Sequence, residues 1–319
     1  MNTFIKCQPL FIILSALMGL GLGYYTSIGH LAVTLIEPFL MMLLFFVFLS
    51  IDNRKLAAAF KNKKFAITAT AINFLWTPIF AYALGLVFFH QSLALQMGLL
   101  MLMVTPCTDW YIVFTSISGG NVALGASILP FNLLLQILLL PVYLIIFFGN
   151  SVHFDILSIL FSMIVVLIIP FALSFGTKAA AKKSSAINRC VNVLKSWGDH
   201  EQLLFLCLAI ICMFASESKQ VFGHPLLFLQ MLLPLIIFFA INLLLVRFIG
   251  KKERLPSADI TALNFTTLAR NSPLSLAIAV AAFPDMPLIS LALVIGPLIE
   301  LPALGIISSI LKKAASSQA

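Results

Sequence analysis

Long apolar runs dominate the sequence, and short polar stretches or stretches with glycine and proline separate them. A helix that crosses the hydrocarbon core of a bilayer needs about 20 mostly apolar residues. Transmembrane barrels instead show short segments of alternating hydrophobicity, whereas these runs are continuously apolar. We therefore predict an all-α integral membrane protein with ten transmembrane helices, near residues 8–27, 31–50, 65–88, 94–117, 122–148, 154–176, 201–217, 225–249, 260–283 and 286–311.

The composition indicates one membrane domain. Of the 319 residues, 61% are hydrophobic and 9% are charged, whereas soluble domains contain about 25% charged residues. The longest weakly hydrophobic stretch, residues 178–202, is too short for a separate domain, which needs about 50 residues. Residues 1–319 are thus expected to form a single transmembrane domain.

The basic residues predict the orientation in the membrane. When successive loops are placed on alternate sides, every Lys and Arg except Lys219 and Arg270 falls on one side. Because loops rich in Lys and Arg stay in the cytoplasm, both termini are predicted to be cytoplasmic in a multi-pass protein of the inner (plasma) membrane. The net charge of +8 then matches anionic lipid headgroups, and no nucleic-acid partner is expected.

The ten predicted spans divide into two halves of five, about 1–150 and 151–319. Because five is odd, repeats of this size must have opposite orientations in the membrane, as in many secondary transporters. Polar interruptions occupy corresponding places in the halves: TPCTDW at 105–110 in the fourth span and ARNSP at 269–273 in the ninth. The pattern predicts two inverted five-helix repeats.

Both interruptions combine a proline with a charge. Pro106 and Pro273 each remove an N–H and clash with the preceding turn. Carbonyls freed in this way are tolerated in lipid only when they are buried in protein or line a cavity. A lone proline commonly gives a simple kink, but Asp109 and Arg270 lie within three residues of these prolines. We predict two broken helices that cross near the midplane, where Asp109 and Arg270 form either a functional pair or a purely structural salt bridge.

Other polar residues also fall in predicted spans. Glu300 lies in the GPLIELP stretch of the tenth span, either in the transport pathway or near the interface as an anchor. Glu37 is a weaker candidate because it lies only seven residues after His30. Asn132 and Gln136 are one helical turn apart, which suits a polar lining or an interhelical hydrogen bond.

Three stretches carry a family resemblance. PCTDWYIVFTSISGGNVALGASILPFN resembles the fourth and fifth spans of the bile acid/arsenite/riboflavin transporter superfamily, in particular its arsenite permease branch. ARNSPLSLAIAV and VIGPLIELP resemble that superfamily's second broken helix and tenth span. The resemblance implies a panel of spans 1, 2, 6 and 7 and a core of spans 3–5 and 8–10, in which the broken helices 4 and 9 cross at the substrate site.

The same resemblance implies a function and site residues. In arsenite permeases the cysteine of the P-C-T motif and a glutamate of the tenth span matter for transport, and these match Cys107 and Glu300. The implied activity is secondary active export of trivalent arsenic in exchange for protons. The predicted substrate-binding or coupling residues are Cys107, Thr108, Asp109, Asn132, Arg270, Asn271, Ser272 and Glu300.

No cofactor or metal site is expected, because the five cysteines lack metal-binding spacing. Sodium coupling is not expected either. The sodium-coupled bile acid branch has E-x-x-x-Q-N in its ninth span, where this chain has Thr266, Arg270 and Asn271. The sequence leaves the oligomeric state open.

Alternatives remain at this point. The substrate is a small molecule or oxyanion, and a small organic anion that pairs with Arg270 is the second candidate, with or without sodium. Cys107 also suits plain packing as a small apolar residue. A membrane-embedded enzyme would use Asp109 as its acid or base, but it needs a second carboxylate, for which Glu300 is the available partner. We therefore predict a transporter rather than an enzyme.

Overall fold

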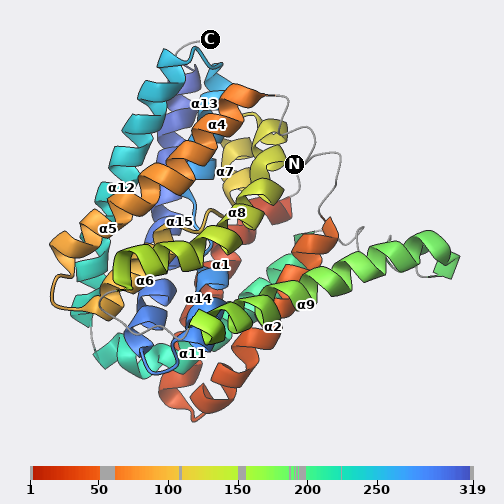
Figure 1. Cartoon of the computed structure of the whole chain (residues 1–319), viewed down its shortest axis with the longest axis vertical. Helices are drawn as coiled ribbons and strands as arrows, with labels where there is room; N and C mark the ends of the chain where they lie inside the picture. Colours follow the sequence, from red (N-terminus) through yellow and green to blue (C-terminus); the bar gives the residue numbers. More distant parts are fainter. Residues whose placement is uncertain are drawn as a thin grey trace. The chain divides into compact units, whose positions relative to one another are not determined.

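The computed structural model describes residues 3–50, 62–107, 110–149, 156–186, 188–189, 191, 193, 199–223 and 225–316. Nearly all of them are helical (Figure 1). The chain separates into two compact units, each of which is described by itself. Unit 1 comprises residues 1–51, 155–224 and 276–284, and unit 2 comprises residues 52–154, 225–275 and 285–319.

Unit 1 contains α1 (Thr3–Tyr25), α2 (Gly29–Ser50), α9 (Ile156–Lys183) and α11 (Asp199–Gly223). Unit 2 contains α4 (Lys63–Ala71), η1 (Ile72–Trp76), α5 (Thr77–Phe88), α6 (Leu93–Met103), α7 (Trp110–Ile117), α8 (Val122–Phe148), α12 (Pro225–Lys252), α13 (Ser257–Leu268) and α15 (Pro287–Ser316). The helix α14 (Ser272–Ala282) begins in unit 2 and continues in unit 1.

Five of the described helices are long and apolar enough to cross a membrane. They are Gly29–Phe46, Lys63–Phe88, Val122–Phe148, Leu229–Lys252 and Pro287–Lys312. Shorter apolar helices include Leu93–Met103, which is half of an interrupted span. The protein is therefore a multi-pass helical membrane protein, while the count of ten spans stays a prediction.

Close helix packing organises unit 1, in which α11 packs against both α1 and α2, and α2 packs against α9. Gly19 and Gly23 lie one turn apart on α1 and face α11. A Cβ atom at Gly19 would lie 2.5 Å from the carbonyl oxygen of Ile211, and one at Gly23 would overlap that of Ala215. Small residues at this spacing let two membrane helices approach closely, and their backbone contact stabilises the pair.

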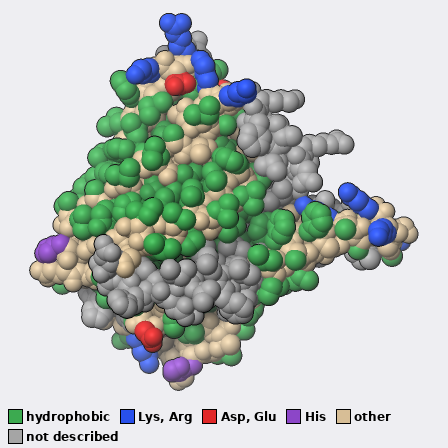
Figure 2. All heavy atoms as spheres, viewed as in Figure 1, with side chains coloured by type: hydrophobic (Ala, Val, Ile, Leu, Met, Phe, Trp, Pro, Cys, Tyr) green, Lys and Arg blue, Asp and Glu red, His purple; other side chains and the backbone are tan. Residues whose placement is uncertain are grey.

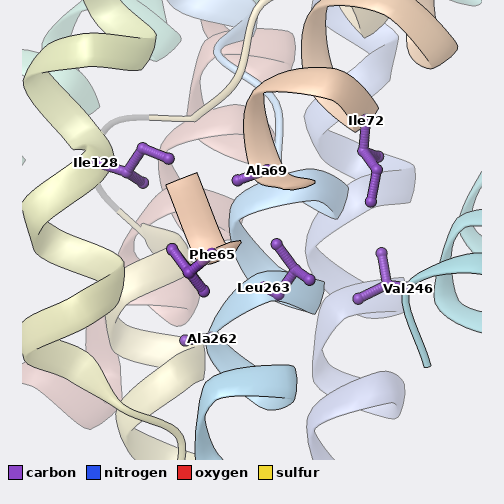
Figure 3. Packing of buried hydrophobic residues seen from close by; sticks show 7 residues of the cluster. All are labelled: Phe65, Ala69, Ile72, Ile128, Val246, Ala262 and Leu263. Carbon is purple, nitrogen blue, oxygen red and sulfur yellow. The ribbon is translucent and has the colours of Figure 1, made fainter. Parts of the chain in front are cut away.

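Unit 2 surrounds α13 with helices from both halves of the chain. α13 packs against α4, α7, α8, α12 and α15, and Figure 1 shows α5 running alongside α12. A buried apolar cluster joins α4, η1, α8, α12 and α13 (Figure 3): Phe65, Ala69, Ile72, Ile128, Val246, Ala262 and Leu263. Along α4 this cluster lies between Lys63 and Asn73. It therefore separates the basic end of unit 2 from the polar residues farther along the same helices.

The outer face of unit 2 is suited to lipid. Figure 2 shows a broad hydrophobic face over α4, α5 and α12, with Lys and Arg gathered where α4 begins and α12 ends. The exposed apolar side chains of these helices include Ile67, Leu75, Ile79, Val87, Leu229, Leu233, Leu244 and Phe248. Apolar flanks with a basic end fit a helix bundle whose basic end lies at a membrane surface.

Substitution of Gly23 tests the packing of unit 1. Gly23→Ala is expected to lower the thermal unfolding midpoint of the detergent-solubilised protein, because the new methyl group must push α1 away from α11 at a cost of about 1–3 kcal/mol. Gly21→Ala is the matched control, because a Cβ atom there meets nothing within 4 Å. Equal midpoints for the two variants would contradict the close α1–α11 contact.

Candidate functional site

Two interrupted helices meet inside unit 2. The first interruption separates α6, which ends at Met103, from α7, which begins at Trp110. The second separates α13, which ends at Leu268, from α14, which begins at Ser272. An antiparallel β-bridge between Pro106 and Arg270 joins them, so the two interruptions lie next to each other.

Backbone hydrogen bonds make this bridge. The amide of Cys107 donates to the carbonyl of Ala269 at 2.9 Å, and the amide of Asn271 donates to the carbonyl of Thr105 at 2.7 Å. Pro106 lies in the non-hydrogen-bonded pair of the bridge, where an N–H is not required. The two breaks thus satisfy each other's backbone groups, as buried amides and carbonyls within a membrane protein require.

Pro273 has a different structural role from the one that the sequence predicts. The sequence suggests that it opens the ninth span and leaves carbonyls unpaired, but the non-helical residues are 269–271, before the proline. Pro273 is the second residue of α14, where the missing N–H is one of those that no helical carbonyl would accept. The side-chain oxygen of Asn271 accepts from the amide of Leu274 at 3.3 Å and so caps the new helix. Pro273 therefore starts the second half-helix rather than breaking the first.

The guanidinium of Arg270 is buried, with 1% of the residue exposed. It donates through Nη1 to the side-chain oxygen of Asn73 at 3.3 Å and through Nη2 to the carbonyl of Thr267. Its central carbon lies 4.9 Å from the ring centroid of Phe238, a cation–π distance. Thr267 belongs to the last turn of α13, whose partial negative charge favours a cation. Three neutral groups from η1, α12 and α13 thus contact the guanidinium, and the carboxylate of Glu300 adds an electrostatic attraction.

Glu300 lies against the second break. It is 13 residues into α15, about 20 Å along this helix, and only 1% of the residue is exposed. Its Oε1 atom accepts from the backbone amide of Arg270 at 2.8 Å, just before α14 begins. The positive end of α14 favours a carboxylate there. Glu300 is thus buried within unit 2, and its place in a transport pathway stays a prediction.

Residues 132 and 136 of α8 also face the interior of unit 2. Asn132 donates to the hydroxyl of Thr266 at 3.2 Å, which is the expected interhelical hydrogen bond. Its carbonyl oxygen, both amide atoms of Gln136 and the hydroxyl of Ser272 are buried without a hydrogen-bond partner among the described residues. Buried polar groups usually have partners. This group of atoms therefore has hydrogen-bonding capacity that a solute or water can use.

Cys107 is buried at the end of the first break, with 3% of the residue exposed. Its amide is part of the bridge, and its thiol is not in a disulfide. Thr108 and Asp109 lie outside the described residues. The predicted Asp109–Arg270 pair thus stays a prediction, and the described side-chain partners of Arg270 are Asn73 and Thr267.

Sequence reasoning missed Asn73. This fully buried residue lies in the π-helix η1, and π-helical turns are frequent at functional sites. Its amide donates to the carbonyl of Thr266 at 3.1 Å while its oxygen accepts from Arg270. The hydroxyl of Tyr143 donates to the carbonyl of Phe74 in the same turn at 2.6 Å. The available signal is an asparagine within an otherwise apolar span.

This architecture defines a class of protein. A multi-pass helical membrane protein in which two interrupted helices bring their ends and buried charges together has the arrangement of a secondary transporter. Residues 37–224, more than half of the chain, match the family described as the Sodium Bile acid symporter family. The chain belongs to this family of transporters.

Three similar proteins indicate which branch of the family this chain resembles. The arsenical-resistance protein Acr3 of Corynebacterium glutamicum is 23% identical, over 94% of this chain and 86% of the relative. The protein of that name from Alkaliphilus metalliredigens is 23% identical, over 82% of this chain and 77% of its own. The uncharacterised protein YbaS of Bacillus subtilis is 24% identical over 92% of both chains. The resemblance to the bile acid/arsenite/riboflavin superfamily and its arsenite permease branch is confirmed.

Replacement of Asn73 tests the centre of this network. Asn73→Ala is expected to destabilise the protein by about 1–3 kcal/mol, because it leaves a guanidinium donor and a buried carbonyl without their partner. The measurement is the thermal or denaturant midpoint of the purified protein. Asn188→Ala provides the matched control at an exposed position and should change stability by less than about 0.5 kcal/mol. If Asn73→Ala leaves the midpoint unchanged, the hydrogen bonds of Asn73 do not stabilise the site.

Proposed function

We propose that this secondary transporter exports arsenite, the trivalent form of arsenic, in exchange for protons across the inner (plasma) membrane. The observation that carries the proposal is a buried thiol, Cys107, at the point where two interrupted helices meet a buried guanidinium and carboxylate. Two relatives that align with most of this chain are named arsenical-resistance proteins, which supports the same substrate.

The proposal includes the ten-helix plan with both termini in the cytoplasm and inverted repeats at about 1–150 and 151–319. The composition of the two units supports it. Unit 1 contains α1, α2, α9 and α11, the segments that the resemblance assigns to the panel. Unit 2 contains most of the segments assigned to the core, including both sides of the first break, while α14 after the second break begins in unit 2 and continues in unit 1.

The thiol suits the chemistry of the solute. Arsenite is mostly an uncharged trihydroxide at neutral pH, and soft sulfur ligands bind soft metal and metalloid centres. Cys107 is the single cysteine among the residues that form unit 2. One thiol captures the solute weakly and reversibly, which suits transport better than a cage of three thiolates.

The buried polar atoms of unit 2 that lack partners suit a neutral hydroxylated solute. Buried groups such as the Gln136 amide and the Ser272 hydroxyl lack partners among the described residues, and hydroxyl groups can both donate to them and accept from them. An organic anion that pairs with Arg270 is the second candidate, and it would have to share a guanidinium whose Nη1 and Nη2 atoms already donate to Asn73 and Thr267. A buried guanidinium and a buried carboxylate also balance each other without an anionic solute.

Glu300 is the proposed proton carrier. A carboxylate buried next to a helix break can accept a proton from one side of the membrane and release it to the other. A membrane potential of 100 mV supplies about 2.3 kcal/mol for each charge that crosses. Exchange of one inward proton for one outward neutral solute would use this energy for export.

Cys107→Ala tests the substrate. An arsenite-sensitive host that expresses the protein is expected to grow in arsenite, and the Cys107→Ala variant should lose that protection because no thiol remains at the break. Cys212→Ala, at a buried cysteine of α11, is the matched control and should keep it. Membrane abundance of all three proteins is measured in parallel. Full resistance in cells with Cys107→Ala would discredit the thiol's role.

Glu300→Gln tests the coupling. Everted vesicles that contain the protein should accumulate arsenite when an inward-acidic gradient is imposed, and arsenite should dissipate that gradient. Glu300→Gln keeps an acceptor for the Arg270 amide but cannot ionise, so both responses should disappear while the protein stays folded. Asp285→Asn, at an exposed acid between α14 and α15, should leave both unchanged. If the Glu300→Gln variant still shows proton-coupled uptake of arsenite, a residue other than Glu300 carries the proton.

A further inference from the structure

The end of α13 is the place where a broken-helix transporter commonly binds a coupling cation. In such transporters unwound carbonyls and the C-terminal ends of half-helices coordinate sodium, and this chain belongs to a family named for sodium symport. Here the side chain of Arg270 turns back to that same end and donates to the carbonyl of Thr267. The cationic position of the half-helix is therefore filled by the chain itself.

The partners of the guanidinium are of the kind that sodium would use. A hard cation takes carbonyl and amide oxygens, and Arg270 engages one of each, from Thr267 and Asn73. Neither partner carries a charge. The ring of Phe238 faces the same guanidinium and supplies a further attraction for a cation. The groups that contact the guanidinium directly are thus neutral, and the buried carboxylate of Glu300 adds an electrostatic attraction for the same positive charge.

The side-chain oxygen of Asn73, which accepts from Arg270, is held in place by a second hydrogen bond of the same side chain. Its amide nitrogen is committed to the carbonyl of Thr266 at 3.1 Å, and this bond directs the side-chain oxygen toward Arg270. A second cation at this position would meet the guanidinium at close range. Two like charges about 4 Å apart in a partly polar interior repel enough to weaken binding on the order of a thousandfold.

We propose that the Arg270 guanidinium is a resident cation that takes the place of the coupling sodium ion, so that the transport cycle runs without sodium. The inference deepens the proposed function, since it excludes one coupling ion, but it does not depend on arsenite being the solute. It also gives Asn73 and Phe238 a role as positioning residues for this charge.

Cation dependence of stability tests the proposal without any transported solute. The purified full-length protein is unfolded by heat in NaCl, KCl or N-methylglucamine chloride at one ionic strength. The wild-type midpoint should be the same in all three salts. Arg270→Ala should unfold at a lower temperature, and millimolar guanidinium or sodium should raise its midpoint saturably, because either ion can enter the vacated site. Arg189→Ala, at an exposed arginine, should behave as the wild type.

Transport in vesicles provides the second readout. Wild-type vesicles should take up arsenite at the same initial rate in sodium and potassium media. Arg270→Ala should be slower by about tenfold or more, the loss expected for one charge-assisted hydrogen bond, and added guanidinium should restore part of the rate. Arg270→Lys keeps a tethered charge and should not respond to guanidinium.

Each outcome decides the proposal. Saturable sodium stabilisation of the wild type, or uptake that requires sodium, overturns it. So does an Arg270→Ala protein that folds but gains no stability from either ion. If Arg270→Ala does not fold, the wild-type salt series and the Arg270→Lys variant still decide. Failure of the wild type to transport arsenite refutes the proposed substrate instead, and the unfolding experiment remains valid.

Discussion

The structure of unit 2 depends on one short backbone contact, the antiparallel bridge between residues 106 and 270. Within a membrane an unpaired amide or carbonyl costs several kcal/mol, about as much as a whole domain can tolerate. Either break alone would leave such groups without partners. Because Cys107 and Asn271 donate across the bridge, each break makes the other tolerable, and the two interrupted helices must therefore meet.

That meeting point determines where charges can be placed. The C-terminal end of α13 attracts a cation and receives Arg270, while the first turn of α14 attracts an anion and receives Glu300 through the amide of residue 270. The two charged residues thus follow from the polarity of the two half-helices that they flank. The buried asparagines and threonines around them then complete hydrogen bonds that lipid cannot provide.

Much of this arrangement is predictable from the sequence, because apolar length and interrupted runs are local properties. The expected span at 122–148 coincides with α8, and the expected break around Pro106 is present. The roles of Asn73 and Pro273 and the burial of Glu300 are not local. Asn73 acquires its importance from a π-helical turn and from Arg270, which is 197 residues away. Pro273 starts a helix because Asn271 caps it, and Glu300 is buried because the amide of residue 270 lies beside it.

The way in which Arg270 is held also bears on how energy enters the cycle. Its side-chain acceptors, on η1 and α13, and the ring on α12 all belong to unit 2. In the proposed cycle, a charge fixed within one unit returns to its starting place with that unit, so it carries no net charge across the membrane. In the proton exchange that we propose, net charge movement then comes from a group that changes its occupancy between the two sides. Among the described residues at the break, Glu300 is the carboxylate that can do this by gaining and losing a proton. A fixed guanidinium and a titrating carboxylate would thus divide the work, one maintaining the polarity of the broken helix and the other supplying the driving force.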